Sequence, residues 1–378
     1  MNRPLPFAAP IYVTRPIAPP LAEYAALLES VWSTRWFTNN GTLHQALEGA
    51  LAEFLRTPNV SLFTNGTIAL IVACQALELT GEVITTPFTF PATPHVLHWN
   101  KLTPVFADVD TETMNIDPDR IEALISPRTS AILAVHVYGT PCAVEPIEAI
   151  ARRHGLRVIY DAAHAFATKI SGTPICAYGD VTMLSFHATK LFHTAEGGAL
   201  IARDPQVKAK IDLLKNFGIR NETEIAMPGI NGKMSELHAA LGLVNLRHYQ
   251  SEWTHRARVA ACYDRELAEV AGLRRSRPAP DVHASLQYYV VRIDRAHAGR
   301  SRDEVHEHLK EFNIFTRRYF YPLCSDYDCY RHLPSADRAR LPVARRAADE
   351  VLALPFFGEL TDDDVSRICE AIRYVLVH

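Results

Sequence analysis

Between about residue 60 and residue 203, continuous apolar runs alternate with segments of helical periodicity, and this alternation constrains the fold more than any other feature. The runs are apolar at successive positions, which is typical of strands in a mostly parallel sheet that helices cover on both faces. Segments 118–125 and 144–154 have the spacing of helices, and Gly155 is placed to end the second one. We therefore predict one large α/β domain. Its expected strands are Val83–Thr86, Pro104–Val109, Ala131–Val137, Arg157–Tyr160, Thr182–Phe186 and Ala199–Ala202.

After Met234 the pattern is helical for about forty residues, and a smaller mixed region follows. The expected elements of that region are a strand at Gln287–Ile293, a helix at Arg302–Phe312 and a strand at Ile314–Phe320. The last helix has apolar residues at spacings of three and four, on one face: Val365, Ile368, Ile372 and Val375. We predict an N-terminal arm and large domain over residues 1–250 and a small C-terminal domain over residues 251–378.

Charge and hydropathy argue against several classes of protein. The formal net charge is −3, and no block of Lys and Arg forms the basic face that is typical of a nucleic-acid binder. No charge-free apolar stretch reaches the roughly 18 residues that a membrane span needs. Six prolines between Met1 and Tyr24 would break the apolar region of a signal peptide, so this segment is predicted to be an extended arm. We expect a cytoplasmic protein that binds neither nucleic acid nor membrane.

The seven cysteines are spread along the whole chain. An odd number in a chain of this length argues against a disulfide framework. Cys324 and Cys329 are close in sequence but have no partners at zinc-binding spacing. We therefore interpret the cysteines as buried or incidental thiols and predict no metal site.

Lys190 is the first candidate for chemistry. It lies between the strand expected to end at Phe186 and the strand expected to begin at Ala199, and Leu191 and Phe192 follow it directly. Apolar surroundings disfavour the charged form of an amine, so its pKa falls and it becomes nucleophilic. A solvated surface lysine is the alternative interpretation of these features.

Asp161 directly follows the expected strand Arg157–Tyr160, at the end where open α/β sheets bind their ligands. Alanines at positions 162 and 163 leave room for a flat ring. An enzyme that uses pyridoxal phosphate (PLP) needs a carboxylate against the pyridine nitrogen, which keeps that nitrogen protonated. A helix N-cap is an equally good interpretation of this aspartate.

Two further segments lie at the ends of expected elements. Asn65-Gly66-Thr67 leads into a helix at Ile68–Leu77, whose free N–H groups and positive dipole end would suit a phosphate. An ordinary loop-to-helix junction is the alternative. Segment 85–90 follows another strand and offers an aromatic ring to a flat ligand, although a phenylalanine more often packs in a core. Neither common glycine-rich nucleotide loop occurs. Taken in order, the phosphate turn, aromatic residue, aspartate and lysine favour a PLP enzyme.

In this order of segments the chain resembles the DegT/DnrJ/EryC1/StrS family of sugar aminotransferases over nearly its whole length. The resemblance implies fold type I of the PLP enzymes, an aspartate-aminotransferase-like α/β fold. Such a fold has a mostly parallel central sheet sandwiched by helices and a smaller C-terminal α+β domain. The similar segments are residues 11–16, 36–41, 65–67, 86–90, 161–165, 185–186, 190, 196–198, 231–237 and 319–323.

The resemblance also implies roles for individual residues. Lys190 would hold PLP as a Schiff base and then move a proton between the cofactor and the substrate carbon. Asp161 would pair with the pyridine nitrogen, Phe90 would stack on the ring, and His164 would lie near the ring hydroxyl. The phosphate would be held by Gly66, Thr67 and Ser185, and by Asn231 of the neighbouring subunit. The implied unit is therefore a homodimer with shared active sites.

Two positions depart from the family pattern, which commonly has glutamine at His164 and usually has arginine at Lys233. Relatives that are sugar dehydratases carry histidine in place of the lysine, so Lys190 favours transamination. The long similar stretches match the branch that aminates C4 of dTDP-4-keto-6-deoxyglucose with L-glutamate as donor, a step of deoxyamino-sugar and glycan biosynthesis.

Three alternatives stay open. The first is amination at C3 of a dTDP-3-keto-6-deoxy sugar, and the second is a PLP enzyme that acts on a cyclitol or another ketone. The third is a non-catalytic sensor with the same fold. The intact Lys190 and Asp161 argue against the sensor, because sensing alone would not need both residues.

Overall fold

The computed structural model describes residues 2–275 and 277–378, so Met1 of the expected arm and Ser276 of the expected small domain lie outside it. Its centre is a seven-stranded sheet in the order β2-β10-β9-β6-β5-β3-β4. Strand β10 is antiparallel to both of its neighbours, and the other pairs are parallel. The expected mostly parallel sheet is therefore confirmed. The strands are β2 (Val60–Phe63), β3 (Glu82–Thr85), β4 (Thr103–Phe106), β5 (Thr129–Val135), β6 (Arg157–Asp161), β9 (Val181–Ser185) and β10 (Gly198–Ala202).

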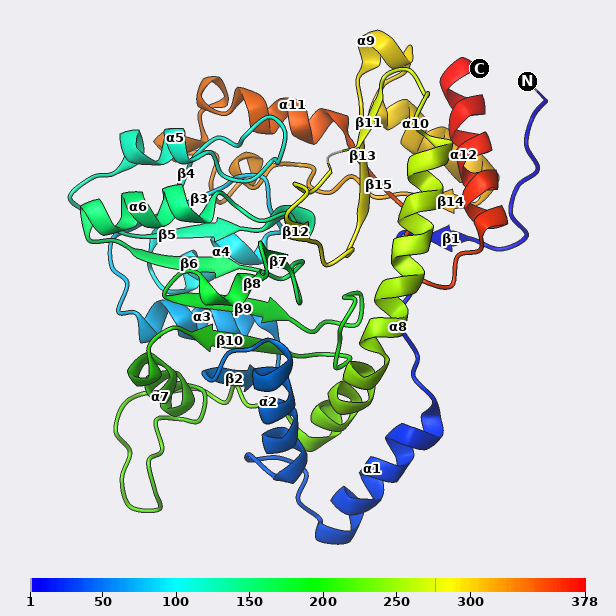
Figure 1. The fold of residues 1–378 in the computed structure, drawn as a ribbon. Helices are drawn as coiled ribbons and strands as arrows, with labels where there is room; N and C mark the ends of the chain where they lie inside the picture. The colour runs from blue at the N-terminus through cyan, green and yellow to red at the C-terminus, as the bar shows by residue number, and fades with distance from the viewer. Residues whose placement is uncertain (1, 276) are drawn as a thin grey trace.

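Helices cover both faces of this sheet (Figure 1). Successive strand residues therefore point into two different cores: Ile132 packs in one and Leu133 in the other, both fully buried. This two-sided burial explains the continuous apolar runs of the sequence. One face is covered by α2 (Thr42–Phe54), α6 (Val144–His154) and the first half of α8 (Glu236–Glu266), and the other by α3 (Gly66–Ala76), α4 (Ala92–Trp99) and α7 (Pro205–Leu214).

Several expected boundaries shift in the structure. Helix α6 spans the predicted residues, and Gly155 ends it in the left-handed conformation that glycine favours. Strand β2 was not among the six predicted strands, and β4 and β5 end earlier than predicted because the chain turns at the sheet edge. The predicted helix at 118–125 is a short helix α5 (Pro118–Ile121) followed by a 3₁₀ turn at Glu122–Leu124.

The C-terminal part contains an antiparallel sheet in the order β11-β13-β15. The four residues predicted to share a face of the last helix are all buried against this part. The predicted strand at 314–320 is confined to its first two residues, because the chain then leaves to line a cavity. The elements are β11 (Leu273–Arg275), β13 (Tyr289–Ile293), α9 (Arg295–Ala298), α10 (Arg302–Leu309), β14 (Ile314–Phe315), α11 (Pro342–Glu350), β15 (Val351–Leu354) and α12 (Asp362–Val377).

Helix α8 crosses the predicted boundary near residue 250. Its residues up to Tyr249 pack in the core of the central sheet, whereas Val259 and the residues after it pack in the C-terminal core. The division into residues 1–250 and 251–378 stays a prediction. A third, small sheet joins β12 (Val282–His283), β7 (Lys169–Ile170) and β8 (Thr173–Pro174).

The expected N-terminal arm has no helix between residues 2 and 20. Its strand β1 (Ile11–Tyr12) pairs in parallel with β14. Helix α1 (Leu21–Thr34) was not predicted, and it makes the last four residues of the predicted arm helical. Within the described residues, no helix has the length and apolar character needed to cross a membrane. Six cysteines are buried and Cys329 is exposed, and no cluster suited to a metal ion occurs in the described part of the chain.

Candidate active site

A cavity of about 360 Å³ lies at the carboxyl ends of β6 and β9. This is the edge of a parallel sheet at which α/β proteins bind their ligands. The cavity brings together seven of the eight residues that the sequence singled out, and the eighth, Asn231, is not part of its wall. The seven are Gly66, Thr67, Phe90, Asp161, His164, Ser185 and Lys190.

Asp161 is the last residue of β6 and is almost fully buried. Its Oδ2 accepts a hydrogen bond from Thr93 Oγ1 at 2.8 Å, and its Oδ1 accepts one from the Ala163 amide at 3.1 Å. Burial raises the pKa of this carboxyl above its usual value, while the hydrogen bonds and the charge of Lys190 oppose that rise. A turn follows Asp161 instead of a helix, so the helix-cap interpretation has no helix to cap.

Lys190 lies on the loop between β9 and β10. Its amide donates to the His187 carbonyl at 2.8 Å, which closes a turn. The next two residues, Leu191 and Phe192, are buried as the sequence implied. Burial lowers the pKa of the Lys190 amine to about 8, and the negative charge of Asp161 opposes this shift. About a tenth of the amine is therefore neutral at pH 7, far more than in an ordinary lysine, and the neutral form is the one that attacks a carbonyl.

The phosphate turn predicted from the sequence is the N-terminus of α3. Asn65 Oδ1 accepts a hydrogen bond from the Ile68 amide at 2.8 Å, so the cap satisfies that donor. The N–H groups of Gly66 and Thr67 have no partner inside the helix, because they belong to its first turn. A side chain at position 66 would meet Met183 Sδ at 3.0 Å, so glycine lets the helix end approach the wall of the cavity. Free N–H groups at a helix N-terminus suit an anion.

His164 is a buried ring with an unsatisfied nitrogen. Its ring is parallel to Phe320 at 6.0 Å and meets Tyr288 edge-on at 5.0 Å. Its Nδ1 has no hydrogen-bond partner among the residues that the structure describes. Burial, and secondarily the charge of Lys190, holds the pKa of His164 well below its usual value, so the ring is neutral. A buried polar atom without a partner in a cavity wall is suited to a ligand hydroxyl.

The two phenylalanines of segment 85–90 have different environments. Phe88 is fully buried, where it packs against Phe320 and Tyr138. Phe90 lines the cavity and is 56% exposed, so its face is available to a flat ligand. The core-packing alternative therefore applies to Phe88, and Phe90 keeps the predicted position.

Sequence reasoning gave no role to several other cavity residues. His187 and Glu196 flank Lys190 on its loop, and their nearest side-chain atoms, Nε2 and Oε1, are 3.7 Å apart. Tyr319 lies in a segment that resembled the family, which was a signal for it. Tyr288 had no signal, because it lies within a run that predicted an ordinary strand.

A second cavity of about 510 Å³ adjoins the first, and Thr189 and Tyr319 line both. Its wall carries Arg317, Arg318 and Lys310. Arg318 pairs with Asp303 and Lys310 with Glu307, whereas Arg317 forms no ion pair with any described residue. The second cavity therefore offers an uncompensated positive charge next to the first.

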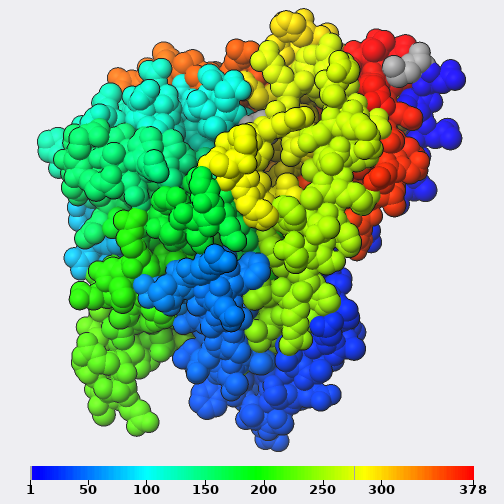
Figure 2. All heavy atoms as spheres, in the orientation of Figure 1, coloured from blue at the N-terminus to red at the C-terminus, as the bar shows by residue number. Residues whose placement is uncertain are grey.

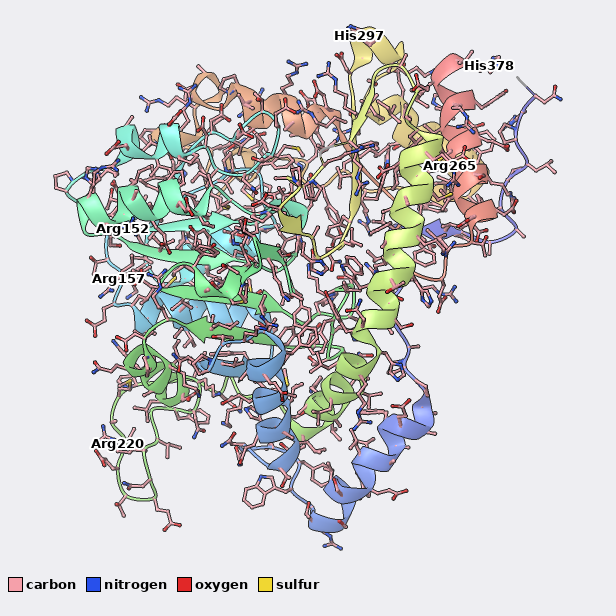
Figure 3. All side chains as sticks on the ribbon, in the orientation of Figure 1. Arg152, Arg157, Arg220, Arg265, His297 and His378 are labelled. Atoms are coloured by element: carbon pink, nitrogen blue, oxygen red, sulfur yellow. The ribbon has the colours of Figure 1, made fainter. Side chains whose placement is uncertain are left out.

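Residues 215–235 form an excursion between α7 and α8 that projects from the body of the molecule (Figure 2), and Asn231 lies near its base, where it pairs with Asn216. Arg220, on the same excursion, lies far out on it (Figure 3). Lys233 Nζ donates to Asn231 Oδ1 at 2.9 Å and stacks over the Phe217 ring at 5.0 Å. Phe217 and Ile225 are large apolar side chains that the excursion leaves exposed.

Comparison with known proteins agrees with this geometry. The model of the DegT/DnrJ/EryC1/StrS aminotransferase family matches residues 21–373. A dTDP-4-amino-4,6-dideoxy-D-glucose transaminase of Escherichia coli is 46% identical over 96% of this chain and 98% of its own length. Its counterpart from Shigella dysenteriae is 45% identical over 97% of this chain and 99% of its own length. A solved structure of DesI in the presence of its TDP-sugar product has a TM-score of 0.94 and 38% identity, covering 99% of this chain and 95% of that one.

Proposed function

Because this chain belongs to the DegT/DnrJ/EryC1/StrS aminotransferase family, we propose that it transfers an amino group from L-glutamate to C4 of a dTDP-4-keto-6-deoxy hexose, with PLP at Lys190. That the chain is an aminotransferase follows from the family. The proposal that PLP is bound at Lys190 is supported above all by one observation: Lys190 and the buried Asp161 line the same cavity. The two transaminases that are 46% and 45% identical over nearly the full chain support the substrate.

The donors and acceptors of the cavity fit PLP. The N–H groups of Gly66 and Thr67 and the hydroxyl of Ser185 would hold the phosphate. The unsatisfied Nδ1 of His164 would meet the ring hydroxyl, and the exposed face of Phe90 would cover the ring. When bound, PLP supplies an electron sink that makes the α-proton of an amino acid acidic.

Asp161 and Lys190 would divide the proton chemistry between them. Asp161 would keep the pyridine nitrogen protonated, and a protonated nitrogen would in turn stabilise a carboxylate that burial alone disfavours. Lys190 would attach the cofactor through its amine and, once released, accept the proton from the donor carbon. Its pKa of about 8 suits this role, because the amine can take up and return a proton near neutral pH.

The second cavity supports a nucleotide-linked acceptor over a free sugar or a cyclitol. A sugar that reaches Lys190 would place an attached diphosphate beyond Tyr319, on the side of Arg317 and Arg318. A planar guanidinium without a protein partner is well suited to a phosphate. A cyclitol would have no group for these side chains.

We also propose a homodimer whose protomers complete each other's sites. Asn231 does not line the cavity of its own chain, and it lies on an excursion with exposed apolar side chains. Large apolar side chains left exposed together on one excursion favour an interaction surface. In the dimer, Asn231 of each protomer would reach the phosphate held by the other.

The reverse half-reaction tests the proposed acceptor. The PLP-loaded enzyme is mixed with dTDP-4-amino-4,6-dideoxy-D-glucose or with the 3-amino isomer, and the conversion to the pyridoxamine form is followed by absorbance. We expect rapid conversion with the 4-amino sugar and slow conversion with its isomer. Faster conversion by the 3-amino sugar would assign the enzyme to C3 amination.

A further inference from the structure

A single buried side-chain amide holds both peptide groups that flank Lys190. Gln287 lies just before β13 and is only 2% exposed. Its Oε1 accepts a hydrogen bond from the Leu191 amide at 2.8 Å, and its Nε2 donates to the Thr189 carbonyl at 2.9 Å. The backbone on both sides of Lys190 is therefore fixed by one side chain from the C-terminal part of the chain.

This contact determines where the amine of Lys190 can reach. The lysine lies on a loop that runs from residue 186 to residue 197, and its side chain has four rotatable bonds. A glutamine amide presents one acceptor and two donors in one rigid plane. When this plane binds the residue before Lys190 and the residue after it, the direction of the bond from Cα to Cβ of Lys190 is set. The volume that Nζ can sample is then restricted to one side of the cavity.

The glutamine is itself held from behind. Arg256 of α8 is fully buried, and its Nη1 donates to the carbonyls of Leu286 and Gln287, both at 3.4 Å. Its Nε donates to Glu252 Oε1 at 2.7 Å, which fixes the guanidinium. The segment that carries Gln287 is therefore anchored to a long helix, and the bracket around Lys190 is a rigid one.

The same segment reaches the opposite side of the site. Ser285 Oγ donates to the His164 carbonyl at 2.5 Å, and the Tyr288 ring meets the His164 ring edge-on at 5.0 Å. Residues 285–288 thus contact both the lysine loop and the histidine that faces it. Their position sets the spacing between these two sides of the cavity.

We infer that Gln287 is a positioning residue, which directs the Lys190 amine at the carbonyl of the bound cofactor by bracketing the two adjacent peptide groups. This inference rests on the proposed function, because it needs PLP to attach at Lys190. A positioning role affects the covalent attachment of PLP alone, whereas a general packing role would affect the binding of any ligand of the cavity. Pyridoxamine phosphate has the same ring and phosphate but no aldehyde, so its binding does not depend on the direction of Lys190.

The test compares covalent attachment of PLP with binding of pyridoxamine phosphate in the full chain stripped of cofactor. Gln287→Met keeps a similar shape and removes both hydrogen bonds. We expect the rate of PLP attachment to fall about tenfold or more, since a small misalignment of reacting atoms has effects of this size. Attachment is followed by absorbance and by mass spectrometry of the borohydride-reduced Lys190 peptide. The dissociation constant of pyridoxamine phosphate should equal that of the wild type within error.

Gln287→Glu provides a rescue that a structural role would not predict. A protonated carboxyl offers one O–H donor and one C=O acceptor, like the amide, whereas the ionised form only accepts. The attachment rate of this variant, relative to the wild type at the same pH, should therefore recover as the pH falls. The relative rate of the Met variant should stay constant with pH. Tyr263→Phe is the matched control, because it removes a buried hydrogen bond to the Pro355 carbonyl, and Tyr263 lines neither cavity.

The outcomes separate the two proposals. Wild-type protein that attaches no PLP at Lys190 overturns the proposed function itself. Normal attachment in Gln287→Met, with a normal wild type, overturns only the positioning role. The positioning role is also overturned if the affinity of Gln287→Met for pyridoxamine phosphate falls by the same factor as its rate of PLP attachment, because Gln287 would then support the whole cavity. The rate of PLP attachment in Tyr263→Phe should equal that of the wild type. If this rate falls as much as in Gln287→Met, the effect of Gln287 is explained by general destabilisation and the positioning role is overturned.

Discussion

Replacing Asp161 with asparagine should separate the charge of this residue from its hydrogen bonds. The amide is isosteric with the carboxylate, and its oxygen can still accept from the Ala163 amide. Its NH₂ group can donate to Thr93 Oγ1, which at present donates to the carboxylate at 2.8 Å. The turn after β6 should therefore survive, and the variant should lose only the negative charge at the bottom of the cavity.

The magnitude follows from the burial of Asp161. Opposite unit charges about 4 Å apart attract by about 4 kcal/mol at an effective dielectric of about 20, and Asp161 is buried enough for such a value. That energy corresponds to a fall of about three units in the pKa of the pyridine nitrogen. The ring would then be unprotonated at neutral pH, and we expect the glutamate half-reaction to slow about a hundredfold or more.

The assay pairs single-turnover kinetics with chemical unfolding of the same preparation. If Asp161 only holds its turn, asparagine should keep both hydrogen bonds, so the variant should keep its stability and react almost normally. If it supports a protonated ring, the half-reaction should be slow in a protein of nearly unchanged stability. A half-reaction within about threefold of the wild type would refute the electrostatic argument.

Other perturbations address the remaining residues. Lys190→Ala should abolish turnover and covalent cofactor attachment, checked by borohydride reduction and mass spectrometry, and should still bind pyridoxamine phosphate. Thr93→Val removes a hydrogen bond that lowers the pKa of Asp161, so this pKa rises and the acid limb of the pH–rate profile should move to higher pH. Arg317→Ala should raise KM for the nucleotide sugar about tenfold with kcat nearly unchanged, because one charge-assisted hydrogen bond is lost. The Lys190→Ala and Asn231→Asp variants should each be severely impaired alone. When the two chains are dissociated and reassembled together, about a quarter of wild-type activity should return. The reason is that about half the dimers are mixed, and one of the two sites in each mixed dimer is intact. Recovery no greater than the average of the two, with chain exchange confirmed, would show that Asn231 is not shared.

The sequence predicted the elements that carry the site because their signals are local. Continuous apolar runs indicate strands buried on both faces; Asp161 ends one of those strands, and Lys190 lies on the loop that follows another. Gly155 predicted a helix end because helices often end at a residue in the left-handed conformation, which glycine adopts without a steric penalty. Boundaries at the ligand edge, such as the end of β5, were less well predicted because the apolar run continues past the last paired residue.

What the sequence could not predict depends on contacts between distant segments. Gln287 and Tyr288 belong to a run that reads as an ordinary strand, and nothing in that run indicates that Lys190 lies beside it. The long helix α8 brings the two together, since Arg256 anchors the segment from the far side. Likewise, the apolar pattern does not distinguish Phe88 from Phe90, and only the resemblance to the family selected Phe90. Their exposures differ because Phe88 packs against Phe320.

The two departures from the family pattern preserve the chemistry of their positions. His164 stands where glutamine is common, and its low pKa keeps the ring neutral, so it still offers one N–H and one acceptor nitrogen, as an amide offers N–H and oxygen. The neutral His164 ring adds no positive charge beside Lys190, and the positive charge of Lys190 itself disfavours protonation of that ring. Lys233 stands where arginine is usual, and it still donates to Asn231 Oδ1 and stacks on Phe217. The turn that presents Asn231 is therefore held by a cation in either case, with one donor where a guanidinium would have several.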